Sequence, residues 1–450
     1  MYSGLSLGVD DVVRDMGRAL QRGDGAYFLG SGISVPSGLP DWLKLMQEVA
    51  GPLGLDITAK DDLALMAQHC VNADAGNRGA LIGRLKRALS SRPRRGNPYH
   101  VAISRTNIRT LWSTNFDTLL EQALAPSRLG VRANDADLTS GTGDFDLELL
   151  KIHGCIDRSA PHQLVLTRED YEEFPAQRPA LAQRLRNDLL HRSLLFAGYS
   201  YNDPNIATIL VEARRLAAKS TREHFLVTRW EKDAEDRKRQ ELWLLDLRRV
   251  GIRAALINDF KELESLLNRL ALASRGKSVF ITGSHTAGDT KAADIGGLLA
   301  GTHEVLFLDG QSEGVGRAAA NAFGTACIKV HTDIRDRIRY FPNPYAFNPK
   351  FSNDVSLLGP LKQWRASLMR AAHTVVVFDG GMGTDAEVEL ARSLGCIIVP
   401  VPNAPDGTAA RLLRDAKIQE ALPPDYVASA KVRSPAAEEV VDCVLGTFSP

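Results

Sequence analysis

Residues 27–42 read YFLGSGISVPSGLPDW, so an apolar run stops abruptly in a glycine-rich turn. The run from Ala26 to Leu29 does not alternate polar and apolar residues, which is typical of a strand buried on both faces of a parallel sheet. Glycines directly after such a strand let the backbone approach a ligand, at the edge where α/β sheets bind nucleotides. The stretch therefore predicts a parallel sheet with a nucleotide site, with an ordinary glycine-rich loop as the alternative.

Strand-like apolar runs alternate with amphipathic stretches from Ala26 to about Leu272. After the first run, the expected strands are IRTLWST (108–114), LELLKIHG (147–154), QLVLT (163–167), SLLFAGYS (193–200), EHFLVT (223–228) and IRAALI (252–257). Strands that alternate with helices indicate a parallel sheet with crossover helices. The fold class that we expect is therefore α/β.

A second series of strands begins after the helix-like segment that starts at Phe260. Its expected members are SVFITGS (278–284), EVLFLDG (304–310), TACIKVH (325–331), HTVVVFDGG (373–381) and CIIVPV (396–401). The boundary between the two series lies between Ser274 and Lys277. We therefore expect two Rossmann-like parallel-sheet domains, over residues 1–274 and 275–450.

The composition excludes several classes of protein. Lys+Arg 55 against Asp+Glu 54 leaves a net charge of +1, so nothing argues for a nucleic-acid partner. No stretch approaches the roughly 18 apolar residues of a membrane span, and the amino terminus lacks a signal-peptide pattern, so we expect a cytoplasmic protein. The five cysteines are far apart and form no CxxC pair, so we expect no metal site.

Three further polar motifs follow predicted strands of the first domain: STNFD (113–117), KIHG (151–154) and GYSYND (198–203). The carboxyl ends of parallel strands lie along one edge of a sheet, so these motifs and the opening glycine loop can line one pocket. Any one of the motifs alone is weak evidence. Four in order across the first domain predict a single site.

Together the four motifs resemble those of the sirtuin-like family. The glycine loop is carried by Gly30, Ser31, Gly32, Ile33 and Ser34, and is followed by Thr114-Asn115-Phe116-Asp117, His153-Gly154 and Gly198-Tyr199-Ser200. The resemblance implies an NAD pocket in which the glycine loop takes the pyrophosphate. It also implies that Asn115 and Asp117 lie near the nicotinamide ribose and that His153 lies beside that ribose.

The chemistry of glycosidic cleavage suits these residue types, because the reaction passes through an oxocarbenium-like state. His153 titrates in the range of a proton acceptor, and Asn115 could orient a ribose hydroxyl or an attacking water. The Asp117 carboxylate could stabilise positive charge on the sugar. The alternatives are that His153 is an ordinary loop residue and that Asn115 caps the following helix. Asp203 is included among the NAD-binding residues, with helix capping as its alternative.

One departure from the sirtuin-like pattern bears on the reaction. Sirtuin deacylases carry a four-cysteine zinc module, which this chain cannot build. The helical segments between Asp41 and His100 and from Ala176 to His191 could close the pocket instead. With water as the acceptor, the expected reaction is hydrolysis of NAD, the substrate, to ADP-ribose and nicotinamide.

A second glycine-rich turn, in VVVFDGGMGTDAEVELA (375–391), leads directly into a helix, so backbone N–H groups face an anion. It resembles the G-G-x-G-T-x-x-E motif of the SLOG nucleotide-binding superfamily, here Gly380, Gly381, Gly383, Thr384 and Glu387. We expect Thr282, Gly283 and Ser284, from the first strand of this domain, to line the same site. Related motifs suggest that Arg365 contacts the ligand's phosphates, with Arg370 as the rival.

A sirtuin-like domain followed by a SLOG domain resembles the NADase effector subunits of bacterial Thoeris anti-phage systems. The resemblance implies activation by a cyclic ADP-ribose isomer made by a separate Toll/interleukin-receptor domain protein. We also expect a homo-oligomer, with a tetramer favoured, because symmetric interfaces offer discrete arrangements for a ligand to select. The alternatives are a non-catalytic NAD-binding regulator and a fusion of two enzymes that act on nucleotide glycosidic bonds.

Overall fold

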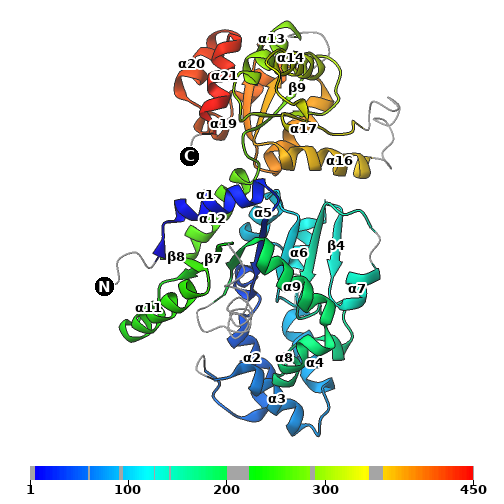
Figure 1. Ribbon diagram of the computed structural model, residues 1–450, viewed down its shortest axis with the longest axis vertical. Helices are drawn as coiled ribbons and strands as arrows, with labels where there is room; N and C mark the ends of the chain where they lie inside the picture. Colours follow the sequence, from blue (N-terminus) through cyan, green and yellow to red (C-terminus); the bar gives the residue numbers. More distant parts are fainter. Residues whose placement is uncertain are drawn as a thin grey trace. The chain divides into compact units, whose positions relative to one another are not determined.

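The computed structural model describes residues 6–58, 61–90, 95–125, 127–140, 143–199, 222–283, 289–343 and 358–448. The chain divides into two compact units (Figure 1). The first contains residues 1–104 and 108–274, and the second contains residues 105–107 and 275–450.

The first unit is built on an eight-stranded sheet in which all strand pairs are parallel. Its strand order is β1-β8-β7-β6-β2-β3-β5-β4. The strands are β1 (Ser6–Leu7), β2 (Gly25–Leu29), β3 (Thr110–Ser113), β4 (Leu129–Arg132), β5 (Leu147–Lys151), β6 (Ser193–Ala197), β7 (His224–Arg229) and β8 (Ile252–Ile257). The opening apolar run therefore forms a central strand, β2.

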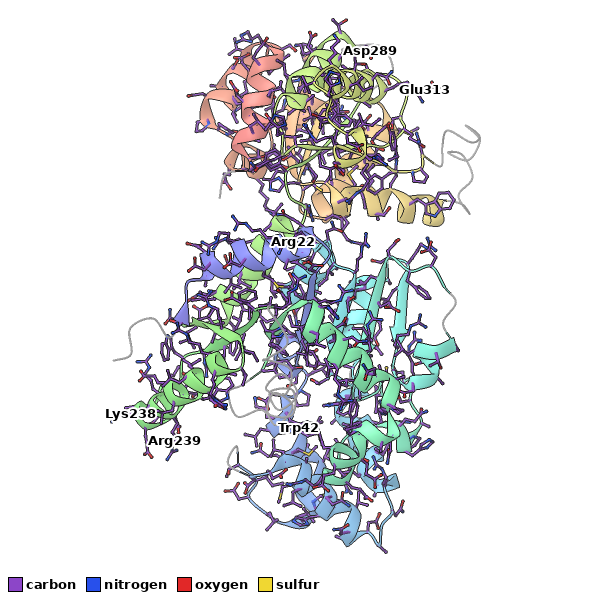
Figure 2. The ribbon with its side chains drawn as sticks, in the orientation of Figure 1. Arg22, Trp42, Lys238, Arg239, Asp289 and Glu313 are labelled. Atoms are coloured by element: carbon purple, nitrogen blue, oxygen red, sulfur yellow. The ribbon has the colours of Figure 1, made fainter. Side chains whose placement is uncertain are left out.

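Helices cover both faces of this sheet. Tyr27 and Leu29 of β2 belong to a core built with α1 (Val9–Gln21), α5 (Pro98–Arg105), α6 (Leu119–Leu124) and α12 (Phe260–Ala273). Ala26 and Phe28 belong to the opposite core, built with α9 (Pro179–His191) and α11 (Ala234–Arg249). Burial on both faces explains why the run does not alternate. Charged residues such as Lys238 and Arg239 project from the outer side of α11 (Figure 2).

A separate helical cluster lies at one end of the first unit (Figure 1). It contains α2 (Trp42–Val49), α3 (Leu63–Ala73), α4 (Gly79–Ser90) and α8 (Arg168–Gln177). The apolar core of α2, α3 and α4 includes Phe116 and Ile156, which follow β3 and β5. The cluster therefore packs directly on the loops that carry the predicted site.

The second unit is built on a five-stranded, all-parallel sheet in the order β11-β10-β9-β12-β13. Its strands are β9 (Ser278–Thr282), β10 (Leu306–Asp309), β11 (Ile338–Tyr340), β12 (Thr374–Phe378) and β13 (Ile397–Val401). Its longer helices are α13 (Asp289–Ala300), α14 (Val315–Lys329), α16 (Leu358–Ala371), α17 (Met382–Ser393) and α21 (Ala437–Gly446). The predicted α/β class is thus confirmed, with a parallel sheet in each unit.

Two predicted strands are wrong. Residues 163–167 form no strand: Pro161–Gln163 is a short 3-10 turn, and Thr167 caps α8 with its side chain. Leu164 and Leu166 are buried in the core of the helical cluster and Val165 is buried beside them, which accounts for the pattern. Residues 325–331 lie in and just after α14, and the third strand of the second sheet is β11.

Candidate functional site

The carboxyl ends of β2, β3, β5 and β6 meet at one edge of the first sheet. Backbone hydrogen bonds join neighbouring strand ends: Gly30 N donates to Ala197 O at 2.9 Å, and Thr114 N donates to Leu29 O at 3.1 Å. The parallel register places Ser113 beside Lys151 in the same way. The structure therefore brings together the four sequence motifs, as far as its described residues extend.

Three glycines pack against one another where β2 and β6 end. A Cβ atom at Gly30 would lie 2.7 Å from Gly198 O, and one at Gly32 would lie 2.8 Å from the same oxygen. Gly198 has a φ of +82°, which favours glycine. The amides of Gly30, Gly32, Ile33 and Ser34 all have backbone acceptors within this packing. These four N–H groups are therefore already bonded within the protein and are not free to bind a pyrophosphate. The predicted contact of the loop with the pyrophosphate falls to the other groups of the loop.

Asn115 is 5% exposed and is held by both its backbone and its side chain. Its Nδ2 donates to Gly30 O at 3.1 Å and to Ser34 Oγ at 3.3 Å, and its N–H donates to Ser113 Oγ at 3.0 Å. Its Oδ1 is buried and has no hydrogen-bond partner among the described residues. Asn115 is thus not the cap of α6, and it offers an acceptor that a ligand or water can satisfy.

His153 is 7% exposed and lies against aromatic rings. Its ring meets that of Tyr171 edge-on, with centroids 5.2 Å apart, and lies 6.4 Å from that of Phe116. Burial, assisted by the positive charge of Arg178, lowers the pKa of His153 to about 3. Our expectation that His153 titrates near neutrality is therefore wrong, and the imidazole is neutral at physiological pH.

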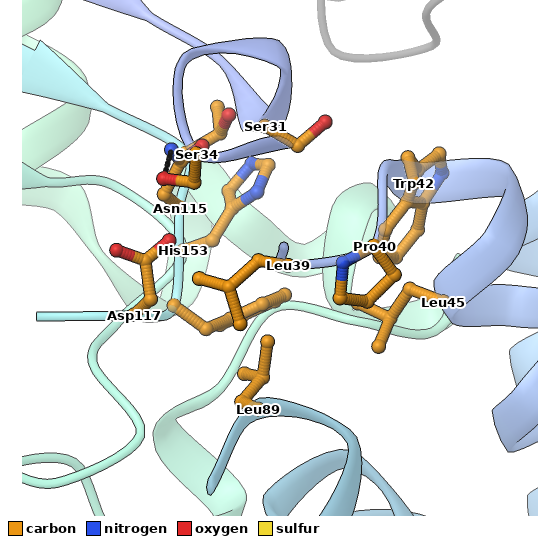
Figure 3. A pocket seen from close by; sticks show the side chains of 12 residues that line it. Ser31, Ser34, Leu39, Pro40, Trp42, Leu45, Leu89, Asn115, Asp117 and His153 are labelled. Atoms are coloured by element: carbon orange, nitrogen blue, oxygen red, sulfur yellow. Dashed lines mark hydrogen bonds between the residues drawn. The ribbon is translucent and has the colours of Figure 1, made fainter. Parts of the chain in front are cut away.

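The side chains of Asn115, His153 and Asp117 line one narrow cavity of about 40 Å³ (Figure 3). Its other polar lining residues are Ser31, Ser34 and Thr114. Its apolar wall consists of Leu39, Pro40, Trp42, Leu45, Leu89 and Phe116. Trp42 and Leu45 come from α2 and Leu89 from α4, so the first of the two predicted helical segments lines the cavity, whereas no residue of 176–191 is among its lining residues.

The size of this cavity limits what can enter it. Ligand pockets typically enclose about 300–1,000 Å³, whereas a water molecule occupies about 30 Å³ of liquid. The described lining therefore leaves a space close to that of one water molecule, far below the usual volume of a ligand pocket. The wall residues Trp42, Leu45 and Leu89 were not among the predicted site residues, because an apolar residue at helical spacing has the same pattern in any core.

Several predicted site residues lie outside the described part of the chain. These residues are Ser200, Asp203 and Ser284. Their predicted roles stay predictions.

In the second unit, Arg365, Glu387 and Thr282 form one buried network. Arg365 is 5% exposed, and its Nη2 lies 2.9 Å from Glu387 Oε1. Its guanidinium also donates to Gly310 O and to Ser312 Oγ, each at 2.8 Å. Thr282 Oγ1 donates to the other oxygen of Glu387. The Nε of Arg365 is buried and has no hydrogen-bond partner among the described residues, so the guanidinium keeps one donor that these contacts do not use. Arg370, the alternative residue, is also buried.

The glycine turn of the second unit forms the start of α17, with Gly381 at the N-cap. No atom lies within 4 Å of a Cβ built at Gly381 or Gly383, so this turn borders open space. Thr384 is buried in the first turn of the helix, and Gly380 O accepts a hydrogen bond from Thr408 Oγ1 at 3.1 Å. At Gly283, by contrast, a Cβ would lie 2.6 Å from that of Phe378, so this glycine serves close packing of β9 and β12.

A cavity of about 430 Å³ opens beside β10 and β11. It is lined by Asp309, Gln311, Arg317, Ala320, Asn321, Ile338, Tyr340 and Asn343. Asp309 and Gln311 flank Gly310, whose carbonyl binds Arg365, so the cavity adjoins the buried network. Its volume lies within the usual range for a small-molecule pocket. This cavity was not predicted from the sequence, although Asp309, an acidic residue at the end of β10, stands where such sites form.

The described residues offer neither a metal-binding cluster nor a membrane-spanning helix. No group of three or more His, Cys, Asp or Glu side chains in those residues is arranged to hold a metal ion. None of the helices among them combines the length and apolar character needed to cross a bilayer.

Comparison with known proteins identifies relatives of this chain. A family model described as a SIR2-like domain matches residues 109–248, which include Asn115 and His153. A protein named NAD(+) hydrolase ThsA from Bacillus cereus (strain MSX-D12) is 29% identical over 287 residues, which cover 61% of this chain and 60% of that protein. A protein of the same name from Acinetobacter baumannii (strain 532279) is 27% identical over 430 residues, covering 87% and 86%.

A more distant relative is named Defense-associated sirtuin 2, from Bacillus subtilis. It is 24% identical over 227 residues, which cover 49% of this chain and 22% of that protein. The chain therefore contains a SIR2-like region and is similar to the ThsA proteins, along most of its length in one case and over about 60% of the relative's length in another. These matches confirm the sirtuin-like resemblance.

Proposed function

We propose that the chain hydrolyses NAD to ADP-ribose and nicotinamide in bacterial anti-phage defence. The observation that carries this proposal is the pairing, in one cavity, of the unpartnered Asn115 Oδ1 with the neutral His153 imidazole. Both groups lie within the SIR2-like match, and the ThsA relatives are named NAD(+) hydrolases.

The chemistry follows from these two groups. A water that donates a hydrogen bond to Asn115 Oδ1 is oriented toward C1′ of the nicotinamide ribose. As the glycosidic bond breaks, its electron pair leaves with nicotinamide, the water oxygen bonds to C1′, and one proton is released. A neutral His153 can accept a hydrogen bond from a ribose hydroxyl or the water without adding positive charge beside the oxocarbenium-like state. The Asp117 carboxylate would stabilise that state from the same cavity.

We further propose that the second unit is a SLOG-type sensor that binds a cyclic ADP-ribose isomer made by a separate Toll/interleukin-receptor domain protein. The 430 Å³ cavity beside the Arg365–Glu387 network supports ligand binding there, because it offers carboxylate, guanidinium, amide and aromatic groups. A ligand that binds the active state more tightly shifts the equilibrium toward it, and a coupling of about 1–3 kcal/mol gives roughly 5–150-fold activation.

The activity is tested by incubating the purified chain with NAD, with and without cyclic ADP-ribose isomers, and measuring nicotinamide and ADP-ribose by mass spectrometry. Stoichiometric release of both products, raised by one isomer, is expected. Binding of NAD without product would instead support a non-catalytic regulator. Cleavage of the cyclic nucleotide at a rate comparable to NAD turnover would support a fusion of two enzymes.

The proposal includes a homo-oligomer, with a tetramer favoured, in which subunit interfaces give the ligand discrete states to select. Light scattering at working concentration, with and without the activating isomer, measures the assembly. A fully active monomer under both conditions contradicts this part of the proposal.

A further inference from the structure

Lys151 is a buried lysine at the carboxyl end of β5, two residues before His153. Its side chain is 1% exposed. Nζ lies 2.7 Å from Glu121 Oε1 and also donates to the backbone carbonyl oxygen of Asp117. Lysine is rarely buried without a partner, because removing an ammonium group from water is unfavourable. The packing of β5 alone therefore does not explain why a charged lysine is buried at this position.

The contacts of Lys151 complete a set of links between two loops of the site. Ile152 N donates to Ser113 O at 3.0 Å, and Ile156 N donates to Phe116 O at 2.9 Å. Both are backbone bonds that any side chains at these positions would allow. The Lys151 ammonium group adds a side-chain donor at Asp117, the last residue of the STNFD loop. The loop that carries Asn115 and Asp117 is thus fixed at three points by the segment that carries His153.

We propose that Lys151 is a positioning residue, whose ammonium group holds the Asp117 backbone so that the Asp117 carboxylate and the Asn115 amide face the cavity together. This inference rests on the proposed hydrolysis of NAD at that cavity. Burial opposes the charged form of Lys151, but the nearby Glu121, Cys155 and Asp117 together outweigh it and raise the pKa of Lys151, so the ammonium persists at neutral pH. A full charge makes the bond to the Asp117 carbonyl stronger than a neutral hydrogen bond.

A different role would explain the same contacts. Lys151 could serve only to neutralise Glu121, whose Oε2 is buried without a partner among the described residues. In that case Lys151→Met is harmful only because it leaves a buried carboxylate unpaired, which is strongly destabilising. Removing both charges together then restores both the stability and the activity of the protein. The two roles therefore differ in what the double variant does.

The experiment compares the wild type, Glu121→Gln, Lys151→Met, and Lys151→Met/Glu121→Gln. Each is assayed for its melting temperature and for kcat and KM of NAD hydrolysis, measured in the same state of activation. Glu121→Gln keeps Nζ and an acceptor for it but removes the charge that opposes its desolvation, so a smaller fall in kcat than in the double variant is expected. In the double variant the melting temperature should recover relative to Lys151→Met, while kcat stays lower by about 100-fold, as expected for a small displacement of a site group, and KM changes little.

A matched control comes from the same strand. Arg132 and Glu148 form another ion pair on β4 and β5, at 3.4 Å, and within the described part of the chain neither side chain is bonded to the STNFD loop. The variant Arg132→Met/Glu148→Gln should alter stability without lowering kcat. A fall in kcat equal to that of the Lys151→Met/Glu121→Gln variant would show a general effect of removing charge from this sheet edge, and would overturn the inference.

A double-mutant cycle tests whether Lys151 acts through Asp117. Asp117→Asn should lower kcat in the wild-type background but have little further effect in the Lys151→Met/Glu121→Gln background, because the carboxylate is already displaced. Full additivity, or full activity of the double variant, overturns the positioning role. If the wild type releases no nicotinamide under any condition, the proposed function itself fails. The two failures are therefore distinguishable.

Discussion

Asn115 Nδ2 donates to Gly30 O at 3.1 Å, so the glycine loop after β2 fixes the amide whose oxygen faces the cavity. Asn115→Ala removes the orienting acceptor, and His153→Ala removes the neutral hydrogen-bond acceptor beside the ribose, so each should lower nicotinamide release by about a hundredfold or more. The measurement is initial rate by mass spectrometry, with circular dichroism to show that the fold persists. Undiminished release from both folded variants contradicts the assignment of these residues.

The low pKa of His153 predicts the pH profile of the reaction. The neutral imidazole is the acceptor, and with a pKa of about 3 it stays neutral as the pH falls well below 6. We therefore expect kcat/KM for NAD to show no loss of activity with a midpoint near 6.5, the ordinary histidine value. The rate should be followed from pH 8 to pH 5 at constant ionic strength. A loss centred near 6.5 that disappears in His153→Gln would show that the histidine titrates normally.

Buried histidines also make the stability of the first unit depend on pH. Burial lowers the pKa of His224 to about 4, whereas the unfolded chain binds this proton near 6.5. Between these values the unfolded state binds more protons, so this contribution is fully present above about pH 6.5 and is lost as the pH falls toward 4. Its slope is at most about 1.4 kcal/mol per pH unit. Calorimetry should show a smaller loss for His224→Gln than for the wild type, and equal losses would refute the prediction.

The apolar wall of the cavity predicts a variant with raised basal activity. Leu89 lines the cavity from α4, and truncating it to alanine should widen the entrance for the nicotinamide ring. We expect kcat/KM without activator to rise severalfold, and the stimulation by activator to fall in proportion. Leu55→Ala is the control, because Leu55 is 57% exposed and does not line the cavity. No change in basal activity for a stable Leu89→Ala variant would contradict a closing role for α4.

The Arg365–Glu387 ion pair predicts a defect in activation that leaves the NAD site intact. Glu387→Gln keeps a hydrogen-bonding side chain but removes the charge, and Arg365→Ala removes the guanidinium. A charged hydrogen bond contributes about 1.5–3 kcal/mol, so each variant should raise the half-maximal activator concentration roughly 10–150-fold. The control is Arg414→Gln, an exposed arginine of the same unit. Activation curves that are unchanged in both variants would show that this network takes no part in binding the activator.

The parallel sheets were predictable because strands buried on both faces leave continuous apolar runs, as in Ala26–Leu29. The same pattern gave a wrong strand prediction at 163–167, where the apolar run results from burial in a helical cluster. It failed again at 325–331, although Val315, Ala319, Phe323 and Cys327 recur every four residues and are all fully buried, which indicates a helix. Strands β4 and β11 were missed because each is short and includes an arginine.

The site was predictable as far as it consists of polar motifs at strand ends. Asn115, Asp117 and His153 do line one cavity, because the parallel register aligns the ends of β3 and β5. The pKa of His153 was not predictable, because it depends on burial against Tyr171 and on Arg178, which is far away in the sequence. The ion pair between Arg365 and Glu387 was not predictable either, because it depends on how α16 packs against α17.

A cavity of about 40 Å³ has a consequence for the cell that makes such an enzyme. Under the proposed function, uncontrolled hydrolysis of NAD would deplete the host's own pool, so the penalty for leakage would grow with the number of copies. If dinucleotide entry requires movement of the α2 and α4 wall, the stored protein would consume little of that pool, however reactive its polar groups are. A bacterium would then be able to keep a large stock of the protein in advance of infection, and the speed of its response would be set by the opening of the wall and not by new synthesis.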